Sequence, residues 1–279
     1  MGKLVDKLRQ VGQGNGGGVG FFGMARQQSR PPRPAAIVVT VGASDAQAAE
    51  AAVGAGADVL VVTGWQPGVD TSAIATAAGD KAVWGVEYAA EGRHAEGSLK
   101  RAKEAGAAFA VLPQSAPAVA LYEDVESFDY IVQLDVPRDD IGLELLRAEN
   151  LLPVQAAMFA SRISGADVAR MSVAEYARLR LAAESLRFPV LLPLADAPQD
   201  AHVKPLVRLG ISGLVLQGAG VAAATLGSQV TALREQLEKT PLRGDDREGD
   251  IVAIAGLMQP AGSSLPRREP EPSPEPDEE

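Results

Sequence analysis

Glu87, Asp135 and Arg138 are the residues whose types and positions best fit chemistry on a small molecule. Glu87 lies near the end of an apolar run at residues 82–88, and Asp135 lies near the end of another at 128–136. Two carboxylates beside an arginine can transfer protons or bind a divalent cation. The same side chains would also form salt bridges where strands end. Either interpretation requires the two apolar runs to end close together in space.

Four more polar side chains lie inside apolar runs or at their ends. They are Thr63, Gln133, Gln155 and Gln217. A glutamine buried among apolar residues needs hydrogen-bond partners, which a bound ligand or a polar layer inside the fold would supply. We predict that these four residues bind a ligand, with the internal polar layer as the alternative.

Arg162 belongs to residues 159–172, the predicted extended loop in the long interval that follows the sixth apolar run. Loops of this length in compact domains often cover a ligand. Arg162 is therefore predicted to bind an anion, and a contact between subunits is the alternative use of the same loop.

The composition excludes several classes of site. Among its 279 residues the chain has no cysteine and two histidines, so thiolate chemistry and a zinc site built mainly from imidazoles are excluded. A net charge of −10 argues against nucleic-acid binding. No apolar run is long enough to cross a bilayer, and the first residues lack the pattern of a secretory signal. We expect a cytoplasmic protein.

The elements that would position these residues are eight short apolar runs. They are apolar on both faces, which is typical of parallel strands covered on both sides. Stretches with helical periodicity separate them, and Gly56, Gly106 and Gly210 each come just before a run, where a helix can end in a left-handed residue. The runs occupy residues 35–41, 58–64, 82–88, 107–113, 128–136, 151–159, 188–194 and 211–218.

This alternation predicts an α/β fold, a closed (β/α)8 TIM-like barrel over residues 35–240. An open doubly wound sheet would give similar local patterns, but no Gly-x-Gly-x-x-Gly follows the first run. In a closed barrel the loops after the strands share one rim, which would bring Glu87 and Asp135 together.

Both ends of the chain differ from the predicted barrel in composition. Residues 1–34 begin with a short amphipathic pattern and continue into a glycine-rich stretch, so we expect an arm that packs on the barrel. Binding of a membrane surface or a partner through Phe21, Phe22 and Met24 is the alternative. Residues 241–265 form an extension, and the acidic, proline-rich residues 266–279 are expected to be disordered.

Residues 194–221, LADAPQDAHVKPLVRLGISGLVLQGAGV, resemble the last quarter of phosphate-binding (β/α)8 barrels. That group includes the tryptophan- and histidine-biosynthesis barrels, thiamine phosphate synthase and the FMN-dependent barrel oxidoreductases. The resemblance implies that Gly218 and Gly220 form a turn whose backbone N–H groups bind phosphate. Asp196 departs from the pattern, because it replaces a glycine and would repel a phosphate. No lysine ends a strand, which disfavours Schiff-base chemistry.

By this fold-level analogy, we expect an enzyme that binds a small anionic, phosphorylated metabolite and performs lyase- or isomerase-type acid–base chemistry. A non-catalytic barrel acting as a binding, regulatory or assembly subunit is one alternative, and an FMN-binding barrel is another. FMN and a divalent metal are the two cofactors that the residues leave open. Assembly into a homo-oligomer is also left open.

Overall fold

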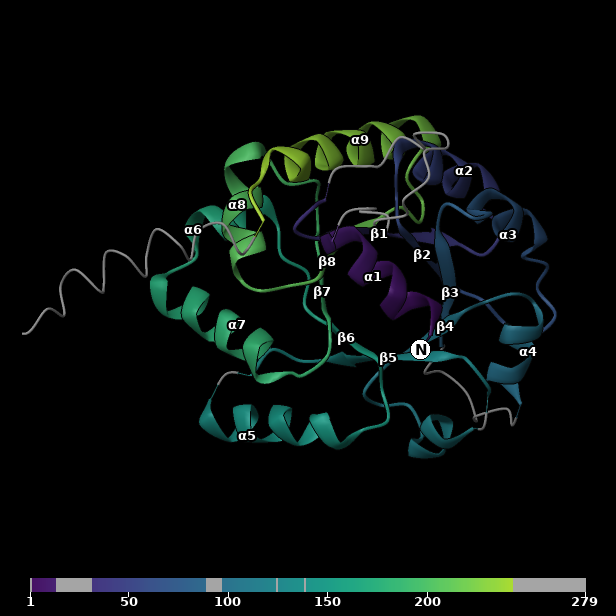
Figure 1. Ribbon diagram of the computed structural model, residues 1–279, viewed down its shortest axis with the longest axis horizontal. Helices are drawn as coiled ribbons and strands as arrows, with labels where there is room; N and C mark the ends of the chain where they lie inside the picture. Colours follow the sequence, from purple (N-terminus) through teal and green to yellow (C-terminus); the bar gives the residue numbers. More distant parts are fainter. Residues whose placement is uncertain (1, 14–31, 89–96, 124, 138, 243–279) are drawn as a thin grey trace, which may run out of the picture. The chain divides into compact units, whose positions relative to one another are not determined.

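Eight parallel strands form a closed barrel in the computed structural model, which describes residues 2–13, 32–88, 97–123, 125–137 and 139–242 (Figure 1). Each strand pairs with the next, and β8 pairs with β1 to close the ring. The closed barrel is therefore confirmed and the open sheet excluded. The strands are β1 (Ala36–Gly42), β2 (Val59–Thr63), β3 (Val83–Glu87), β4 (Phe109–Leu112), β5 (Asp129–Leu134), β6 (Ala156–Phe159), β7 (Val190–Pro193) and β8 (Gly213–Gln217).

Helices surround the barrel and follow the strands in turn (Figure 1). The predicted helix ends at Gly56, Gly106 and Gly210 are confirmed, because these glycines have φ angles of 110°, 100° and 88°. The helices are α2 (Ala46–Ala55), α3 (Ser72–Ala78), α4 (Ser98–Glu104), α5 (Asp140–Ala148), α6 (Gly165–Arg170), α7 (Val173–Ser185), α8 (Asp200–Arg208) and α9 (Ala223–Lys239), with short 3-10 helices η1 (Ala118–Tyr122) and η2 (Glu149–Leu151).

Three segments differ from the simplest eight-unit pattern. The connection between β4 and β5 holds the 3-10 helix η1, which begins after Pro117. The sixth strand begins at Ala156, after Pro153, since proline cannot donate a ladder hydrogen bond. The interval predicted as an extended loop contains the helix α6. A capping box, in which Ser164 and Asp167 bond each other's backbone N–H groups, starts that helix.

The strands bury two different sets of side chains, as their alternation requires. One set packs against the helices, and the other fills the interior of the barrel. The interior is tightly filled where Phe109 of β4 crosses to Gly85 of β3. A Cβ at Gly85 would lie 2.4 Å from the backbone oxygen of Phe109 and 2.5 Å from its ring. Gly85 therefore makes room for the phenyl ring.

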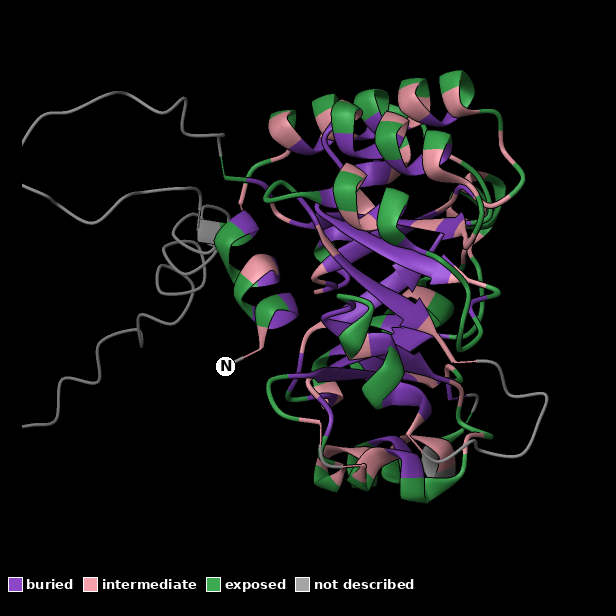
Figure 2. Ribbon diagram, turned by 90° about the vertical axis from the view of Figure 1, so that its right-hand side faces the viewer, coloured by how far each residue is buried: buried purple, intermediate pink, exposed green. Residues whose placement is uncertain are grey.

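Helix α1 (Lys3–Gln13) lies across the ring of strands and packs on its interior (Figures 1 and 2). Its apolar residues Leu4, Leu8 and Val11 belong to the same buried cluster as the interior strand residues. The predicted amphipathic helix that packs on the barrel is confirmed. Residues 14–31 of the predicted arm, including Phe21, Phe22 and Met24, lie outside the described residues, as do residues 243–279.

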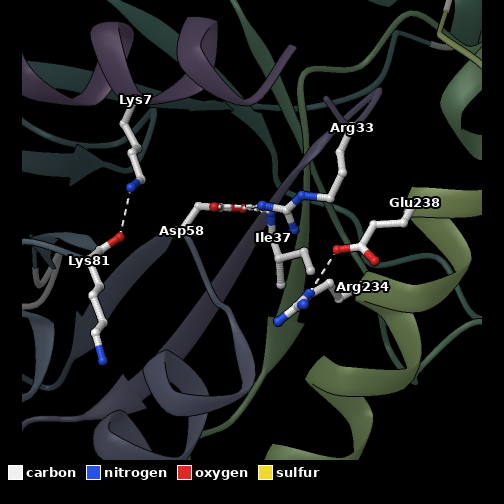
Figure 3. Close-up of polar contacts among 7 residues, drawn as sticks. All are labelled: Lys7, Arg33, Ile37, Asp58, Lys81, Arg234 and Glu238. Atoms are coloured by element: carbon white, nitrogen blue, oxygen red, sulfur yellow. Dashed lines mark hydrogen bonds and ion pairs between the residues drawn. The ribbon is translucent and has the colours of Figure 1, made fainter. Parts of the chain in front are cut away.

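Three polar contacts hold α1 in place, and Figure 3 shows the one made by Lys7. The backbone N–H of Leu4 donates to Asp129 at 3.0 Å, and the ammonium of Lys7 donates to the backbone oxygen of Lys81 at 2.7 Å. At the other end, the N–H of Arg33 donates to the backbone oxygen of Val11 at 3.0 Å. These contacts make α1 a fixed floor of the barrel.

A buried ion pair joins the starts of β1 and β2 (Figure 3). One guanidinium nitrogen of Arg33 donates to both carboxylate oxygens of Asp58, at 2.7 and 2.8 Å. The N–H of Ile37 donates to the same carboxylate at 2.9 Å. Arg33 is 3% exposed and Asp58 is 2% exposed, so the pair is shielded from water. On the outer surface, Arg234 and Glu238 pair along α9 at 2.8 Å (Figure 3).

None of the helices within the described residues is long and apolar enough to cross a membrane.

Candidate functional site

The carboxyl end of the barrel has a ring of polar side chains. Each of these polar residues lies two positions after a residue that faces the barrel interior. Those interior residues are Val38, Val61, Gly85, Ile131 and Val215, of which Gly85 contacts Phe109 inside the barrel. Because side chains alternate along a strand, the polar residues also point inward. All are half-buried, whereas the interior residues beneath them are buried or glycine. The ring consists of Thr40, Thr63, Glu87, Gln133 and Gln217.

Glu87 and Gln133 meet across this mouth. The carboxamide nitrogen of Gln133 donates to Oε1 of Glu87 at 3.4 Å. Glu87 ends β3 and Gln133 lies near the end of β5, and β4 separates these strands in the barrel. The two side chains therefore reach toward each other over the open end of the barrel. A carboxylate held in this way can exchange a proton with a ligand in the mouth.

Thr40, Thr63 and Gln217 form the opposite side of the ring. Thr40 of β1 pairs in register with Gln217 of β8. The hydroxyl of Thr63 donates to the backbone oxygen of Val41 at 3.2 Å. Thr40 was absent from the predicted site, although a lone threonine within an otherwise apolar run was the available signal.

The structure does not place Asp135 in the ring beside Glu87. Asp135 follows the last residue of β5 and is exposed. Within the described part of the chain, no hydrogen bond links it to Glu87. Arg138 lies outside the described residues. Of the two described members of the predicted carboxylate–arginine group, Glu87 lies in the ring and Asp135 does not.

Gln155 lies away from the mouth. It comes directly before β6, at the amino end of that strand. Its side-chain oxygen accepts a hydrogen bond from the N–H of Tyr130 at 2.7 Å, and its own N–H donates to the oxygen of Tyr130 at 2.9 Å. These two bonds tie the side-chain oxygen and the backbone N–H of Gln155 to Tyr130 of β5. The placement of Gln155 inside strand six was wrong, because the strand begins one residue later.

Arg162 and Asp196 lie near the amino end of α6. Arg162 is exposed on the segment that leads into this helix. The carboxylate of Asp196 accepts a hydrogen bond from the N–H of Gly165 at 2.8 Å. The ring of His202 packs over the same glycine, because a Cβ there would lie 2.9 Å from its Nδ1. Asp196 thus fastens the β7–α8 connection to α6, a role that the sequence did not indicate.

The turn after β8 leads into the longest helix of the barrel. The N–H of Gly218 donates to the backbone oxygen of Thr40 at 2.9 Å, and a Cβ at Gly218 would lie 2.5 Å from that oxygen. Gly218 is therefore required by close packing, and its N–H is already used. Gly220 has a φ of 78°, a left-handed conformation that favours glycine.

The amino end of α9 carries no side-chain cap. Ala222 precedes the helix, and its methyl group cannot accept a hydrogen bond from the first turn. The first N–H groups of a helix have no partner within the helix and attract anions. Among the described residues, no group of three or more His, Asp and Glu side chains is placed to hold a metal ion.

Tyr88, next to Glu87 in sequence, lies in a less polar environment. Burial raises the pKa of the Tyr88 phenol, and the nearby Glu123 carboxylate raises it further, while a hydrogen bond with Ser98 lowers it. Tyr88 therefore stays protonated at neutral pH. Its hydroxyl therefore acts as a hydrogen-bonding group, with Ser98 of α4 as a partner, and not as a base.

The chain matches no protein-family model and no curated protein by sequence. Solved structures do resemble it. Thiamine phosphate pyrophosphorylase from Pyrococcus furiosus matches with a TM-score of 0.54 at 12% identity, over 73% of this chain and 96% of that chain. Orotidine 5′-phosphate decarboxylase from Pyrococcus horikoshii matches with a TM-score of 0.53 at 10% identity, over 73% of this chain and 100% of that chain.

A mutant tryptophan synthase α-subunit from Pyrococcus furiosus is a third similar structure, with a TM-score of 0.53 at 14% identity, over 73% of this chain and 99% of that chain. Identities this low carry information about the fold and not about the reaction. The resemblance to phosphate-binding (β/α)8 barrels is confirmed at the level of the fold.

Proposed function

We propose that this protein is an enzyme that binds a small phosphorylated metabolite in the carboxyl mouth of the barrel and catalyses a lyase- or isomerase-type reaction. Glu87 is the residue that moves the proton. The observation that carries the proposal is the 3.4 Å hydrogen bond by which Gln133 holds one carboxylate oxygen of Glu87 across the mouth. The other oxygen makes no hydrogen bond to a described residue, and we assign it to the substrate.

The remaining ring residues would orient the substrate. Thr40, Thr63 and Gln217 offer hydroxyl and carboxamide groups that can donate or accept hydrogen bonds. Asp135 lies two residues after Gln133, and we assign it as a second carboxylate above the substrate. We assign Arg138 and Arg162, which follow β5 and β6, to the anionic part of the substrate.

The phosphate would bind at the turn before α9. Gly220 and the uncapped amino end of this helix supply backbone N–H groups, which suit an anion. Two structurally similar enzymes, thiamine phosphate pyrophosphorylase and orotidine 5′-phosphate decarboxylase, are named for phosphorylated compounds. Their fold supports the choice of a phosphorylated ligand here.

Thermal-shift measurements on the full chain test the proposal. The probes are ribose 5-phosphate, dihydroxyacetone phosphate, inorganic phosphate and FMN, with and without Mg²⁺. A ligand that binds the folded protein raises Tm according to its concentration relative to Kd. We expect at least one phosphorylated probe to raise Tm, and Gly220→Asp to abolish the rise because it adds a negative charge beside the phosphate.

The catalytic assignment needs a second measurement. Once a turned-over ligand is found, Glu87→Gln should lower kcat by about 10²–10⁴-fold, the usual contribution of a general acid–base group. Glu104→Gln, an exposed substitution at the end of α4, is the matched control and should leave kcat unchanged. Equal kcat values for Glu87→Gln and the original chain would contradict the role of Glu87.

A non-catalytic barrel is the second candidate function. The ring contains one carboxylate among hydroxyls and carboxamides, which is a composition suited to recognition without proton transfer. This candidate predicts that a phosphorylated probe raises Tm while no probe is converted to product. FMN binding would be distinguished from it by the flavin absorbance that remains with the protein after gel filtration.

A further inference from the structure

A cleft of about 360 Å³ lies beside the mouth, between helices α6 and α7 and the connections that follow β5 and β6. Its volume falls within the range of small-molecule sites. Side chains of Val136, Ile163, Met171 and Leu179 give it an apolar floor. Leu179 is buried and the other three pack half-buried against the core. The floor is therefore part of the stable body of the protein.

Two arginines line the same cleft. Arg170 ends α6 and Arg178 lies on α7. Neither guanidinium makes a hydrogen bond or ion pair with another described residue. By contrast, Arg180 on the same helix α7 pairs with Glu184 at 3.0 Å. The cleft thus has two cationic groups whose donors are available for a ligand.

The two carboxylates of the cleft are already engaged. The N–H and hydroxyl of Ser164 donate to one oxygen of Asp167 at 2.8 and 2.7 Å. Ser172 does the same for Glu175, also at 2.8 and 2.7 Å. These hydrogen bonds, with a smaller contribution from the charges of Arg170 and Arg178, hold the pKa of both carboxyl groups below their ordinary values, so both are ionised at neutral pH.

The charged residues that line the cleft favour a ligand with a single negative charge. Among the described lining residues two guanidiniums balance two carboxylates, so the cleft has no net positive charge to offset the larger desolvation cost of a doubly charged phosphate, and a ligand with one negative charge fits better. A carboxylate also matches the planar fork of a guanidinium with two parallel hydrogen bonds. The apolar floor would accommodate a hydrocarbon body attached to that carboxylate.

We propose that this cleft is a second binding site, for a small organic monoacid whose carboxylate contacts Arg170 and Arg178 and whose hydrocarbon body lies on the floor. The site is separate from the ring around Glu87, and it does not depend on the function proposed for that ring.

Methionine methyl groups allow the two sites to be observed separately. The chain has five methionines, of which Met171 lines the cleft and Met158 lies in the barrel interior beside Gln133. In the full chain labelled with [methyl-¹³C]methionine, the Met171→Leu and Met158→Leu variants assign the two signals. Hexanoate and 3-phenylpropanoate are the probes. We expect either probe to shift the Met171 signal in a saturable manner while the Met158 signal stays in place.

The charge requirement is tested with matched compounds and variants. Hexan-1-ol and hexyl phosphate should bind the original chain at least about tenfold more weakly than hexanoate does. Hexanoate should bind Arg170→Gln or Arg178→Gln at least about tenfold more weakly than it binds the original chain. Arg180→Gln, which removes the arginine already paired with Glu184, is the control and should bind hexanoate as the original chain does. All three arginines are exposed, so the variants should remain folded, which their Tm values verify.

Four outcomes would overturn the proposal: a Met171 signal that neither acid shifts, a shift of Met158 instead, equal binding of hexan-1-ol, or unchanged binding by both cleft variants. A shift of the Met158 methyl signal on addition of ribose 5-phosphate would support binding in the mouth of the barrel and would say nothing about the cleft. The proposed function and the cleft can therefore fail independently.

Discussion

The carboxylate of Asp129 accepts a hydrogen bond of 3.0 Å from the backbone N–H of Leu4, 125 positions earlier in the chain. Asp129 begins β5, and Leu4 lies in the first turn of α1. The first N–H groups of a helix lack partners within the helix, so Asp129 acts as a cap supplied by the barrel. Gly2 allows this approach, because a Cβ there would collide with the carboxylate.

Asp129 should make stability depend on pH. Burial raises the pKa of this carboxyl group above its ordinary value of 3.8, against the lowering effect of the hydrogen bonds from Leu4 and Val5. The folded protein therefore binds a proton more readily than the unfolded chain. The contribution of Asp129 to the free energy of unfolding should fall as pH rises from 3.8 through the raised pKa, and should be level on either side of that window.

Urea unfolding of the original chain and of Asp129→Asn, from about pH 3 to about pH 7, measures this effect. Asparagine keeps an oxygen for the Leu4 N–H but has no proton to lose. The stability of the original chain relative to Asp129→Asn should fall with rising pH across that window. A difference that is constant, or that grows with pH, would show that Asp129 does not titrate in this way.

The floor formed by α1 should contribute strongly to stability. Leu4 is fully buried, so Leu4→Ala should lower the free energy of unfolding by about 2–5 kcal/mol, as expected for a leucine removed from a core. Gln10→Ala, on the exposed face of the same helix, should change it by less than about 0.5 kcal/mol. Similar small effects for both variants in urea unfolding would mean that α1 does not pack on the barrel in solution.

Gly218 should tolerate no side chain. Gly218→Ala would place a Cβ 2.5 Å from the backbone oxygen of Thr40 and 2.9 Å from Leu226, so we expect a loss of about 1–3 kcal/mol from overpacking. Gly227→Ala on α9 is the control, since its Cβ would have no neighbour closer than 3.8 Å. That variant should gain up to about 1 kcal/mol from helix propensity. Thermal unfolding measures both, and a neutral Gly218→Ala would contradict the close approach.

The buried pair of Arg33 and Asp58 should be sensitive to the loss of one partner. Arg33→Met leaves the Asp58 carboxylate buried and unpaired, and should cost about 3–5 kcal/mol. The double variant Arg33→Met, Asp58→Asn should recover much of that loss, because asparagine is neutral and still accepts from the Ile37 N–H. If the double variant is no more stable than Arg33→Met, then burial of an unpaired charge is not the cause.

The barrel could be predicted from the sequence because its signals are local and repeated. Each strand is a short apolar run, and Gly56, Gly106 and Gly210 mark helix ends by a conformation that glycine adopts most easily. The inward direction of Glu87 and Gln133 also follows from alternation, once the strand ends are known. What the two side chains do together depends on the barrel being closed.

The remaining site residues depended on information that is not local. Gln155 was misplaced because the start of β6 differs from the start of the apolar run, and proline at 153 was the available signal. Thr40 joins the ring through its pairing with Gln217, which requires closure between the first and last strands. Asp196 acts through Gly165, 31 positions away, and a single sequence gives no indication of that contact.

The position of α1 also bears on how the chain acquires its structure during synthesis. This helix leaves the ribosome before any strand of the barrel, yet it rests on β1, β3 and β5 and is capped by a carboxylate at position 129. Its binding surface is complete only after β8 has been made and has paired with β1. A helix translated before the barrel is thus among the last elements to dock, and until then its leucines are exposed to water.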